Sequence, residues 1–191
     1  MKAGLTGIVH GRFQPFHIGH FSYLSEALSL YSSVVIGITN PDTSSLHQVA
    51  SDDHRHLPEA NPFTYFWRSR MIQLSVAACP KLSSRLRDIT TVPFRIHEPP
   101  DDWRSYFPHS GGEHIMRVLD EWDREKAEKF KKAGYQVRLL SGTRECSGTE
   151  VRKDIFAGGS RWRTLVPEGT AAVLGKWLEQ HDETFPRRES L

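Results

Sequence analysis

Cysteine, long hydrophobic runs and an excess of either charge are all scarce in this chain. Its only two cysteines, Cys79 and Cys146, lie far apart and form no C-x-x-C pair, so neither a disulfide framework nor a cysteine metal site is expected. No apolar run approaches the roughly 18 residues of a membrane span, and no charged-then-apolar leader opens the chain. We expect a cytoplasmic protein with no membrane partner.

Charge and length narrow the class further. The 25 basic and 23 acidic side chains give a formal net charge of +2, which argues against a dominant nucleic-acid-binding surface. The 191 residues, of which 38% are hydrophobic, are enough for a single sizeable core. We therefore expect one domain over residues 1–181, followed by a frayed tail at 182–191.

Apolar runs and amphipathic segments alternate along the chain. The first strand, the first helix and the second strand fall within about 35 residues, which is a βαβ unit and implies a parallel sheet. The pattern predicts an α/β fold, a Rossmann-like doubly wound parallel sheet in a single domain. The expected strands are 5–9, 33–39, 88–96, 114–118 and 135–140, and the expected helices begin at Ile18 and Asn61 or span 120–134, 148–157 and 167–180.

The second of these helices is predicted from its first residues. Asn61 is a favourable N-cap, and Pro62 suits the first helical position. Residues 40–60 before it are polar and lack a period, so they are expected to form a long loop. The expected buried stripe of the helix is Phe63, Trp67, Met71, Leu74 and Ala78.

The segment "HGRFQPFHIGH" follows the first predicted strand. In open parallel sheets, ligands bind beyond the carboxyl ends of the strands, where loops lead into helix N-termini. His17 and His20 are three apart in the first helical turn, so both imidazoles are expected on one side. Gly11 permits a sharp turn, and Gly19 permits a phosphate to approach the backbone. Together with Arg12 and the helix terminus, these residues predict an anion site.

The segment "SGTEVRKDI" makes a second constellation. Ser147 and Glu150 have the spacing of a capping box at a helix start. Thr149 and Arg152 are three apart, so a hydroxyl and a guanidinium are expected on one helical face. A plain capped helix with a solvated arginine is the alternative when this segment is taken alone. Next to the first constellation, a phosphate site between two helix N-termini is the favoured interpretation.

The triplet S-G-T occurs twice, at Ser141–Thr143 and at Ser147–Thr149. Only the second copy places an arginine, Arg152, three residues after its threonine. Arg144 directly follows the first copy and does not lie a helical turn away. The second copy is therefore predicted to face the phosphates.

These segments resemble a known family. "GRFQPFHIGH" closely resembles the H-x-G-H signature of the nucleotidyltransferase superfamily, nearest to archaeal-type nicotinamide mononucleotide adenylyltransferases. "NPFTYFWRSRMI" and "SGTEVRKDIFAGGSRWRTLVP" are similar to that family's helix and C-terminal signature. The resemblance implies catalytic roles for His17, His20 and Arg152. It implies nucleotide binding by Gly11, Arg12, Phe13, Gly19, Ser147, Thr149 and Arg152.

Five further residues are weaker candidates for substrate binding. Arg68 matches an arginine that the resemblance places near the phosphates, although the neighbouring Trp67 stands where the family is usually acidic. A surface salt bridge is the alternative for Arg68. Arg55 is a candidate for a substrate phosphate. Trp103 is a candidate for stacking on a base or a pyridine ring, as are Tyr106 and Phe107, with core or lid packing as the alternative.

The histidines near Arg55 form a separate cluster. His47, His54 and His56 have the donor atoms for zinc, but no cysteine or i,i+4 helical spacing accompanies them. A solvated polar loop is the favoured interpretation. No metal ligand from protein side chains is predicted anywhere in the chain.

The expected reaction is nucleotidyl transfer. A nucleoside monophosphate, AMP from ATP, would pass to the phosphate of a small molecule such as nicotinamide mononucleotide, and pyrophosphate would leave. The alternative is a CTP-dependent cytidylyltransferase that acts on a phosphonate or phosphomonoester. Mg²⁺ is the expected cofactor, held mainly by triphosphate oxygens and water. No serine or cysteine nucleophile is paired with a base, so the acceptor is expected to attack the α-phosphorus directly.

Two other classes are weighed against this reaction. A fragment of a class I aminoacyl-tRNA synthetase also carries HIGH, but no K-M-S-K-S-like run occurs and no tRNA-binding domain is evident. A nucleotide-binding regulator without catalysis is disfavoured by the intact His17, His20 and Arg152. The expected partners are the nucleoside triphosphate and the acceptor. The sequence leaves the base, the acceptor and a homo-oligomer open.

Overall fold

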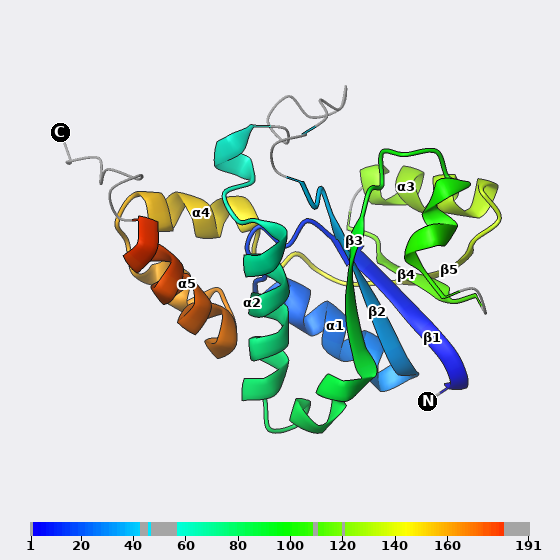
Figure 1. The fold of residues 1–191 in the computed structure, drawn as a ribbon, viewed down its shortest axis with the longest axis horizontal. Coiled ribbons are helices and arrows are strands. Elements are labelled where there is room, and N and C mark those ends of the chain that lie inside the picture. The colour runs from blue at the N-terminus through cyan, green and yellow to red at the C-terminus, as the bar shows by residue number, and fades with distance from the viewer. Residues whose placement is uncertain (1, 43–45, 47–56, 109–110, 120, 182–191) are drawn as a thin grey trace. The chain divides into compact units, whose positions relative to one another are not determined.

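The computed structural model describes residues 2–42, 46, 57–108, 111–119 and 121–181. Five strands form one parallel sheet in the order β3-β2-β1-β4-β5 (Figure 1). The order reverses beside β1, where α/β sheets commonly bind ligands. The strands are β1 (Lys2–Gly11), β2 (Tyr31–Thr39), β3 (Ile89–Phe94), β4 (Glu113–Arg117) and β5 (Gln136–Leu140).

Helices connect these strands and follow the last one. The α-helices are α1 (Ile18–Leu30), α2 (Tyr65–Ala78), α3 (Glu121–Lys132), α4 (Gly148–Phe156) and α5 (Glu168–His181). Short 3₁₀ helices occur at Pro58–Ala60, Ser83–Asp88, Asp102–Tyr106 and Arg161–Thr164. Among the described residues, no helix is both long and apolar enough to cross a bilayer. The predicted α/β class with a parallel sheet is confirmed.

The chain folds as two compact units that alternate along the sequence. The sheet unit comprises Met1–Arg12, Ser22–Pro41 and Arg87–Arg144, and therefore holds all five strands and α3. The helical unit comprises Phe13–Phe21, Asp42–Leu86 and Glu145–Leu191, and holds α2, α4, α5 and the first turn of α1.

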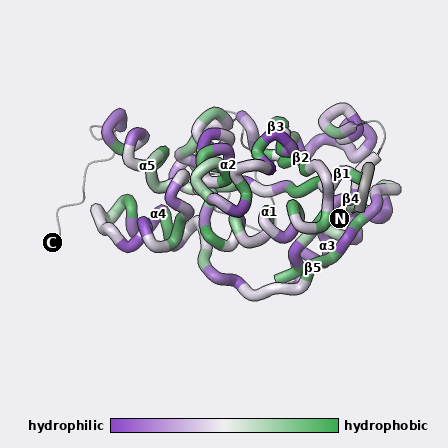
Figure 2. Tube along the Cα trace, turned by 90° about the horizontal axis from the view of Figure 1, so that it is seen from below, coloured by the Kyte–Doolittle hydropathy of each residue, from purple (hydrophilic) through white to green (hydrophobic). Residues whose placement is uncertain are grey.

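In the sheet unit, helices cover both faces of the sheet, as a doubly wound fold requires. Ile8 and Met116 share a core cluster with Phe130 of α3. Side chains alternate along a strand, so Arg117 points to the opposite face from Met116. There Arg117 pairs with Glu26 of α1 at 3.0 Å. Hydropathy colouring separates the hydrophilic α3 from the hydrophobic strand β2 (Figure 2).

The helical unit is built on the contact between α2 and α5. Gly169 lies so close to α2 that a Cβ there would come within 2.1 Å of the Leu74 carbonyl carbon. Beside it, the hydroxyls of Ser75 and Thr170 are 2.9 Å apart in a buried hydrogen bond. Small and hydroxyl residues therefore allow the backbones of α2 and α5 to approach each other. The sequence periodicity instead predicts that α2 packs through an apolar stripe.

The helix predicted from Asn61 begins later and buries a different face. α2 starts at Tyr65 with Thr64 as its N-cap residue. The Asn61 side chain donates to the Leu57 carbonyl, so it does not cap the helix. Of the predicted stripe, Phe63 and Met71 are buried, whereas the others are half-buried or exposed. The buried residues within α2 are Arg68, Ser69, Met71, Ile72, Ser75 and Val76.

The other predicted helices and strands agree with the structure. The helices predicted at 148–157 and 167–180 correspond to α4 and α5, and the five predicted strands correspond to β1–β5 with ends that differ by a few residues. Residues 40–60, predicted as one loop, contain the short helix Pro58–Ala60. Much of that loop and the predicted tail at 182–191 lie outside the described residues.

Candidate active site

The loop that leads into α1 is held in an unusual backbone shape. Phe13 has a φ of 53°, in the left-handed region that residues other than glycine rarely adopt. The Gln14 side chain donates to the Phe63 carbonyl at 2.8 Å and accepts from the Phe63 amide at 3.0 Å. The ring of Phe13 lies edge-on to those of Phe16 and His20. Buried packing and a two-point amide clamp therefore fix the residues just before His17.

His17 and His20 are stacked on each other. Their ring centroids are 3.6 Å apart and their planes differ by 22°. The His17 amide donates to Nδ1 of His20, and the His20 amide donates to Nδ1 of His17, both at 3.4 Å. Because each Nδ1 faces an N–H group, the proton of a neutral ring belongs on Nε2. The two stacked rings therefore present Nε2–H donors together. This agrees with the prediction that both imidazoles lie on one side of the first helical turn.

Gly19 stands between the two histidines for a steric reason. A Cβ at this position would lie 3.3 Å from the ring of His17, tighter than ordinary van der Waals contact. It would also reach 4.0 Å from the Cys146 carbonyl oxygen. The glycine thus allows the ring of His17 to lie over the first turn of α1.

Burial determines the charge of His17. The side chain is almost inaccessible, and its burial together with the nearby charge of Arg152 lowers its pKa to about 4. A neutral imidazole is therefore the form present at neutral pH. His17 is equipped to donate a hydrogen bond but carries no charge of its own.

Ser147 caps α4 as the sequence predicts. Its hydroxyl accepts the amide of Glu150 at 3.1 Å. The Glu150 carboxylate pairs with Arg161 at 2.8 Å, so it is engaged outside the reciprocal capping box. The first of the two S-G-T triplets has no helix after it, whereas the second leads directly into α4. The predicted helical register of the second copy is confirmed.

Arg152 joins α4 to the loop before His17. One Nη atom donates to the Gln14 carbonyl, and the other donates to the Thr149 hydroxyl at 3.3 Å. Arg152 is only 7% exposed, and burial lowers its pKa from the ordinary value. The predicted pairing of Thr149 with Arg152 is present. A guanidinium and a neutral imidazole thus lie in one part of the helical unit.

Contacts within the helical unit engage the start of α1. The Ile18 amide donates to the Leu165 carbonyl at 3.0 Å, and the Cys146 thiol contacts the same oxygen at 3.7 Å. Gly148 approaches the Gln14 carbonyl so closely that a Cβ would come within 2.5 Å of it. The N-termini of α1 and α4 are therefore neighbours, each next to the loop of the first motif. At least one of the N–H groups at the start of α1 is already used inside the protein.

Three other predicted residues lie at the end of β1 or in α2, and a fourth lies outside the described residues. Gly11 ends β1 and Arg12 follows it, both in the sheet unit. Arg68 is fully buried in α2, and its Nε donates to the Thr64 carbonyl at 3.3 Å. Arg55 lies outside the described residues, as do His47, His54 and His56.

Trp103 corrects a prediction of ligand stacking. The residue is fully buried in the core of the sheet unit, and its Nε1 donates to the Glu98 carbonyl at 2.9 Å. Its ring is 4.5 Å from that of Phe130 and 5.6 Å from that of Phe94, measured between centroids. Trp103 is a core residue because aromatic neighbours from distant segments enclose it, and it presents no face to a substrate.

Gln14 is the structural residue that sequence reasoning missed. It is buried, accepts Arg152 on its carbonyl and clamps Phe63 through its side chain. The only available signal was a single amide side chain inside the otherwise aromatic and proline-containing stretch "FQPF". Such a residue needs partners when buried, but its partners are 49 and 138 positions away in sequence.

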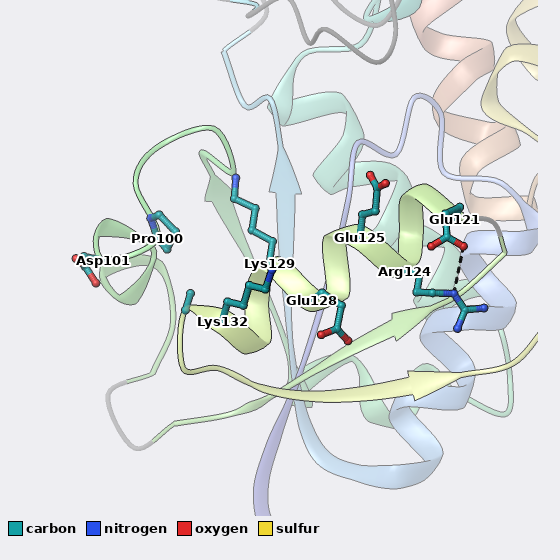
Figure 3. Close-up of a pocket in the computed structure, with 9 residues that line it drawn as sticks. Pro100, Asp101, Glu121, Arg124, Glu125, Glu128, Lys129 and Lys132 are labelled. Carbon is teal, nitrogen blue, oxygen red and sulfur yellow. Dashed lines mark ion pairs between the residues drawn. The ribbon is translucent and has the colours of Figure 1, made fainter.

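A pocket of about 650 Å³ lies along α3 and contains none of these residues. Its described lining mixes acidic and basic side chains of α3 with Pro100 and Asp101 (Figure 3). Glu121 and Arg124 form an ion pair across 3.4 Å at one end (Figure 3). We assign it no role, because its charges are mixed and exposed and no buried polar group faces it.

The donor atoms of the described residues do not form a metal cage. No group of three His, Cys, Asp or Glu side chains that would hold a metal ion is found among them.

The helical unit thus carries the stacked His17 and His20 together with the capped helix that bears Arg152. Residues 8–154 match the cytidylyltransferase-like family. The chain belongs to this cytidylyltransferase-like family of nucleotidyltransferases.

Two relatives illustrate the range of this family. A phosphonoformate cytidylyltransferase from Streptomyces viridochromogenes is 34% identical over 171 residues, covering 88% of this chain and 90% of the relative. A nicotinamide-nucleotide adenylyltransferase from Methanococcus aeolicus is 30% identical over 175 residues, covering 89% and 88% of the two chains.

Solved structures agree on the fold. A bifunctional NMN adenylyltransferase/ADP ribose pyrophosphatase from Francisella tularensis, crystallised with AMP and a manganese ion, has a TM-score of 0.59 at 14% identity. That likeness covers 97% of this chain, and this chain spans 57% of that larger protein.

Proposed function

We propose that the protein transfers a nucleoside monophosphate from a nucleoside triphosphate to a phosphonate or phosphate oxygen of a small acceptor. The observation that carries this proposal is the stacked pair of His17 and His20 beside Arg152. In the reaction, an acceptor oxygen forms a bond to the α-phosphorus while the bond to the β-phosphate oxygen breaks, and pyrophosphate leaves. Catalysis then rests on positioning and on donors directed at developing charge.

Each residue of the pair has a role in this proposal. His17 and His20 would donate from Nε2 to oxygens of the transferring phosphate and its leaving group. Arg152, backed by Thr149, would neutralise the β- and γ-phosphates. A neutral His17 suits a hydrogen-bond donor that must not take a proton at physiological pH. These residues are proposed to be the catalytic and phosphate-binding set.

The residues around the pair complete the proposed nucleotide site. Gly11, Arg12 and Phe13 are proposed to bind the nucleotide, and Gly19 would let a phosphate near the backbone. Ser147 holds the start of α4, where backbone N–H groups favour anions. Arg68, which is buried in α2, is also proposed to lie near the phosphates.

Mg²⁺ is the proposed cofactor. The described chain lacks a cluster of carboxylates, which fits an ion that the triphosphate itself brings. When bound, such an ion supplies positive charge that screens the phosphate oxygens. The protein residues bind and orient the triphosphate.

For the donor and acceptor, we propose CTP and a small phosphonate-bearing acid. The supporting observation is the 34% identity to the phosphonoformate cytidylyltransferase over most of both chains. A proposal of adenylyl transfer to nicotinamide mononucleotide rests on the relatives at 30% identity and below.

The test is a matrix of two donors and two acceptors. Purified protein with Mg²⁺ is given CTP or ATP together with phosphonoformate or nicotinamide mononucleotide, and pyrophosphate release is followed. Phosphorus NMR identifies the new phosphoanhydride in the product. Turnover with CTP and phosphonoformate alone supports the proposal, and turnover with ATP and nicotinamide mononucleotide alone supports the second candidate. Nucleotide binding without turnover of any pair would favour a regulator.

Three expectations about the surroundings of the enzyme complete the proposal. It would act on small molecules without a nucleic-acid or membrane partner, in the cytoplasm. A homo-oligomer stays open, and size-exclusion chromatography with light scattering would determine it.

A further inference from the structure

A second pocket lies in the sheet unit, at the amino-terminal ends of β4 and β5. Its volume is about 320 Å³, within the range of small-molecule sites. Its apolar walls include Ile8, Phe107 and Pro108. The first motif, in contrast, follows the carboxyl end of β1. This pocket is therefore separate from the strand ends at which α/β enzymes usually place their substrates.

His114 lines this pocket and is 1% exposed. Neither of its ring nitrogens has a hydrogen-bond partner in the part of the chain that the structure describes. Buried polar atoms without partners are rare in native proteins and call for an explanation. Phe107, Phe130 and Tyr135 surround the ring at centroid distances of 4.8 to 5.1 Å, so these aromatic neighbours leave both nitrogens unsatisfied.

The protonation state of His114 defines what it offers to a ligand. Burial, with a smaller contribution from the charge of Lys126, lowers its pKa to about 3. At neutral pH the ring is therefore uncharged, with one N–H donor and one nitrogen acceptor. An uncharged ring that carries a hydrogen-bonding atom on its edge would therefore match the imidazole of His114.

The pocket has a single cationic side chain among its described lining residues. Arg104 is exposed, and its guanidinium carbon lies 6.0 Å from the centre of the Tyr135 ring. No ion pair joins Arg104 to a carboxylate within the described ranges. A planar guanidinium fork can pair with both oxygens of a carboxylate at once.

Among the described residues, two glycines at the rim of the pocket carry no side chain that would cover it. Gly111 and Gly134 have φ values of +78° and +82°, and a Cβ on either would meet no atom within 4 Å. Gly112 approaches Ile8 so closely that a Cβ would come within 2.6 Å of its Cδ1. Gly111 and Gly134 thus place no side chain over this part of the pocket, which His114 lines from inside the fold.

From these observations we propose that this pocket binds a small aromatic carboxylate whose ring carries a hydrogen-bonding nitrogen. The ring lies against Ile8 and Phe107, its nitrogen pairs with His114, and its carboxylate pairs with Arg104. The site is additional to the nucleotidyl-transfer site and does not depend on the proposed reaction. Its test therefore measures binding alone.

The experiment uses three probes of one shape with the full-length protein. Quinoline-3-carboxylate has both the ring nitrogen and the charge, 2-naphthoate lacks the nitrogen, and quinoline-3-carboxamide lacks the charge. Each is titrated while amide NMR signals of Gly111, Gly112 and Gly134 report occupancy of the pocket. We expect quinoline-3-carboxylate to bind at least about fivefold more tightly than either analogue, because each analogue loses one polar contact.

Matched variants assign the two polar contacts. His114→Phe should abolish the preference for quinoline-3-carboxylate over 2-naphthoate. His10→Phe is its control: the ring nitrogens of His10 also lack hydrogen-bond partners among the described residues, and its ring lies 5.7 Å from that of His114, but it does not line the pocket. Arg104→Met should abolish the preference for the carboxylate over the carboxamide, whereas Arg124→Met on α3 should preserve it.

Two results would overturn the proposal. One is the absence of shifts at the three rim glycines with every probe at millimolar concentration. The other is an unchanged order of affinities in His114→Phe and Arg104→Met. If His114→Phe fails to fold, Arg104→Met still tests the proposal, because Arg104 is exposed. In that variant the preference for quinoline-3-carboxylate over quinoline-3-carboxamide must disappear for the proposal to hold.

Discussion

His17 and His20 contact each other through ring nitrogens and backbone amides, so each residue orients the other. The three-residue spacing with glycine between them is what permits this arrangement. Phe13 and Phe16 enclose His20 from the other side. A change at either histidine therefore affects the direction of the remaining donor as well as the number of donors.

His20→Ala should lower kcat by roughly 10²- to 10³-fold, the scale of losing one preorganised donor to a developing charge. The midpoint of thermal unfolding should barely move, because His20 is only partly buried. Steady-state kinetics and differential scanning fluorimetry measure the two effects. A folded His20→Ala protein with near-normal kcat would remove His20 from the proposed mechanism.

The two arginines that follow the S-G-T triplets provide a second comparison. Arg152→Ala should raise the KM for the triphosphate and lower kcat, because it removes a buried cation bonded to Gln14 and Thr149. Arg144→Ala should change either parameter less than about threefold, well under the ~1.4 kcal/mol of a tenfold effect. Arg144 is exposed and precedes the helix.

Circular dichroism supplies the control for both arginine variants. Arg152→Ala leaves the Gln14 carbonyl without its guanidinium, which costs about 1–3 kcal/mol of stability. Arg152→Lys, which keeps the charge, separates lost charge from lost geometry. A damaging Arg144→Ala together with a harmless Arg152→Ala would move the phosphate site into the loop before α4.

At the scale of elements, the helical unit depends on how closely α2 and α5 approach. Gly169→Ala should destabilise the protein, because the new Cβ would overlap the Leu74 backbone at 2.1 Å and force the helices apart. Gly175→Ala in the same helix should be neutral or stabilising by up to about 1 kcal/mol, since its Cβ would enter open space and alanine favours helix. Urea unfolding of both variants measures the difference. Equal stability of the two would show that the close approach is not required.

The buried histidines give the whole molecule a predictable response to acid. Burial lowers the pKa of His17 to about 4 and that of His114 to about 3, and it lowers the pKa of His10 as well. The unfolded chain takes up these protons below about pH 6.5, whereas the folded protein does not. Stability should therefore be full above pH 6.5 and fall as the pH drops from 6.5 towards 3.

For each of His17 and His114 the loss of stability should reach about 2 kcal/mol at pH 5, from about 1.4 kcal/mol per pH unit. Urea unfolding at pH 7.5, 6.5, 5.5 and 5.0 measures it. His114→Phe removes one of the groups, so its stability should depend less steeply on pH across this range. An unchanged slope in that variant would mean that His114 takes up its proton in the folded protein as well.

Metal removal tests the proposed reaction as a whole. EDTA should abolish turnover and added Mg²⁺ should restore it, because the triphosphate carries more charge than His17, His20 and Arg152 screen. The unfolding midpoint of the protein without nucleotide should stay the same in EDTA, since no metal cage occurs among the described residues. Full activity in metal-free buffer would contradict the proposal.

Prediction from sequence succeeded where the evidence was local. The alternating pattern identified the parallel α/β class, and S-x-x-E located the start of α4 at Ser147. The α2 helix was placed too early, because Asn61 and Pro62 look like a helix start in isolation. In the structure, Gln14 holds Phe63 from 49 residues away and delays the helix to Tyr65.

The sequence by itself determined which side chains share a helical face, because residues three apart are neighbours in any helix. His17 with His20 and Thr149 with Arg152 follow from that geometry alone. Only the tertiary structure decided that Arg152 bonds to the Gln14 carbonyl and that Trp103 is a core residue. Burial and charge depend on atoms brought together from distant parts of the chain, and local spacing carries no information about which atoms those are.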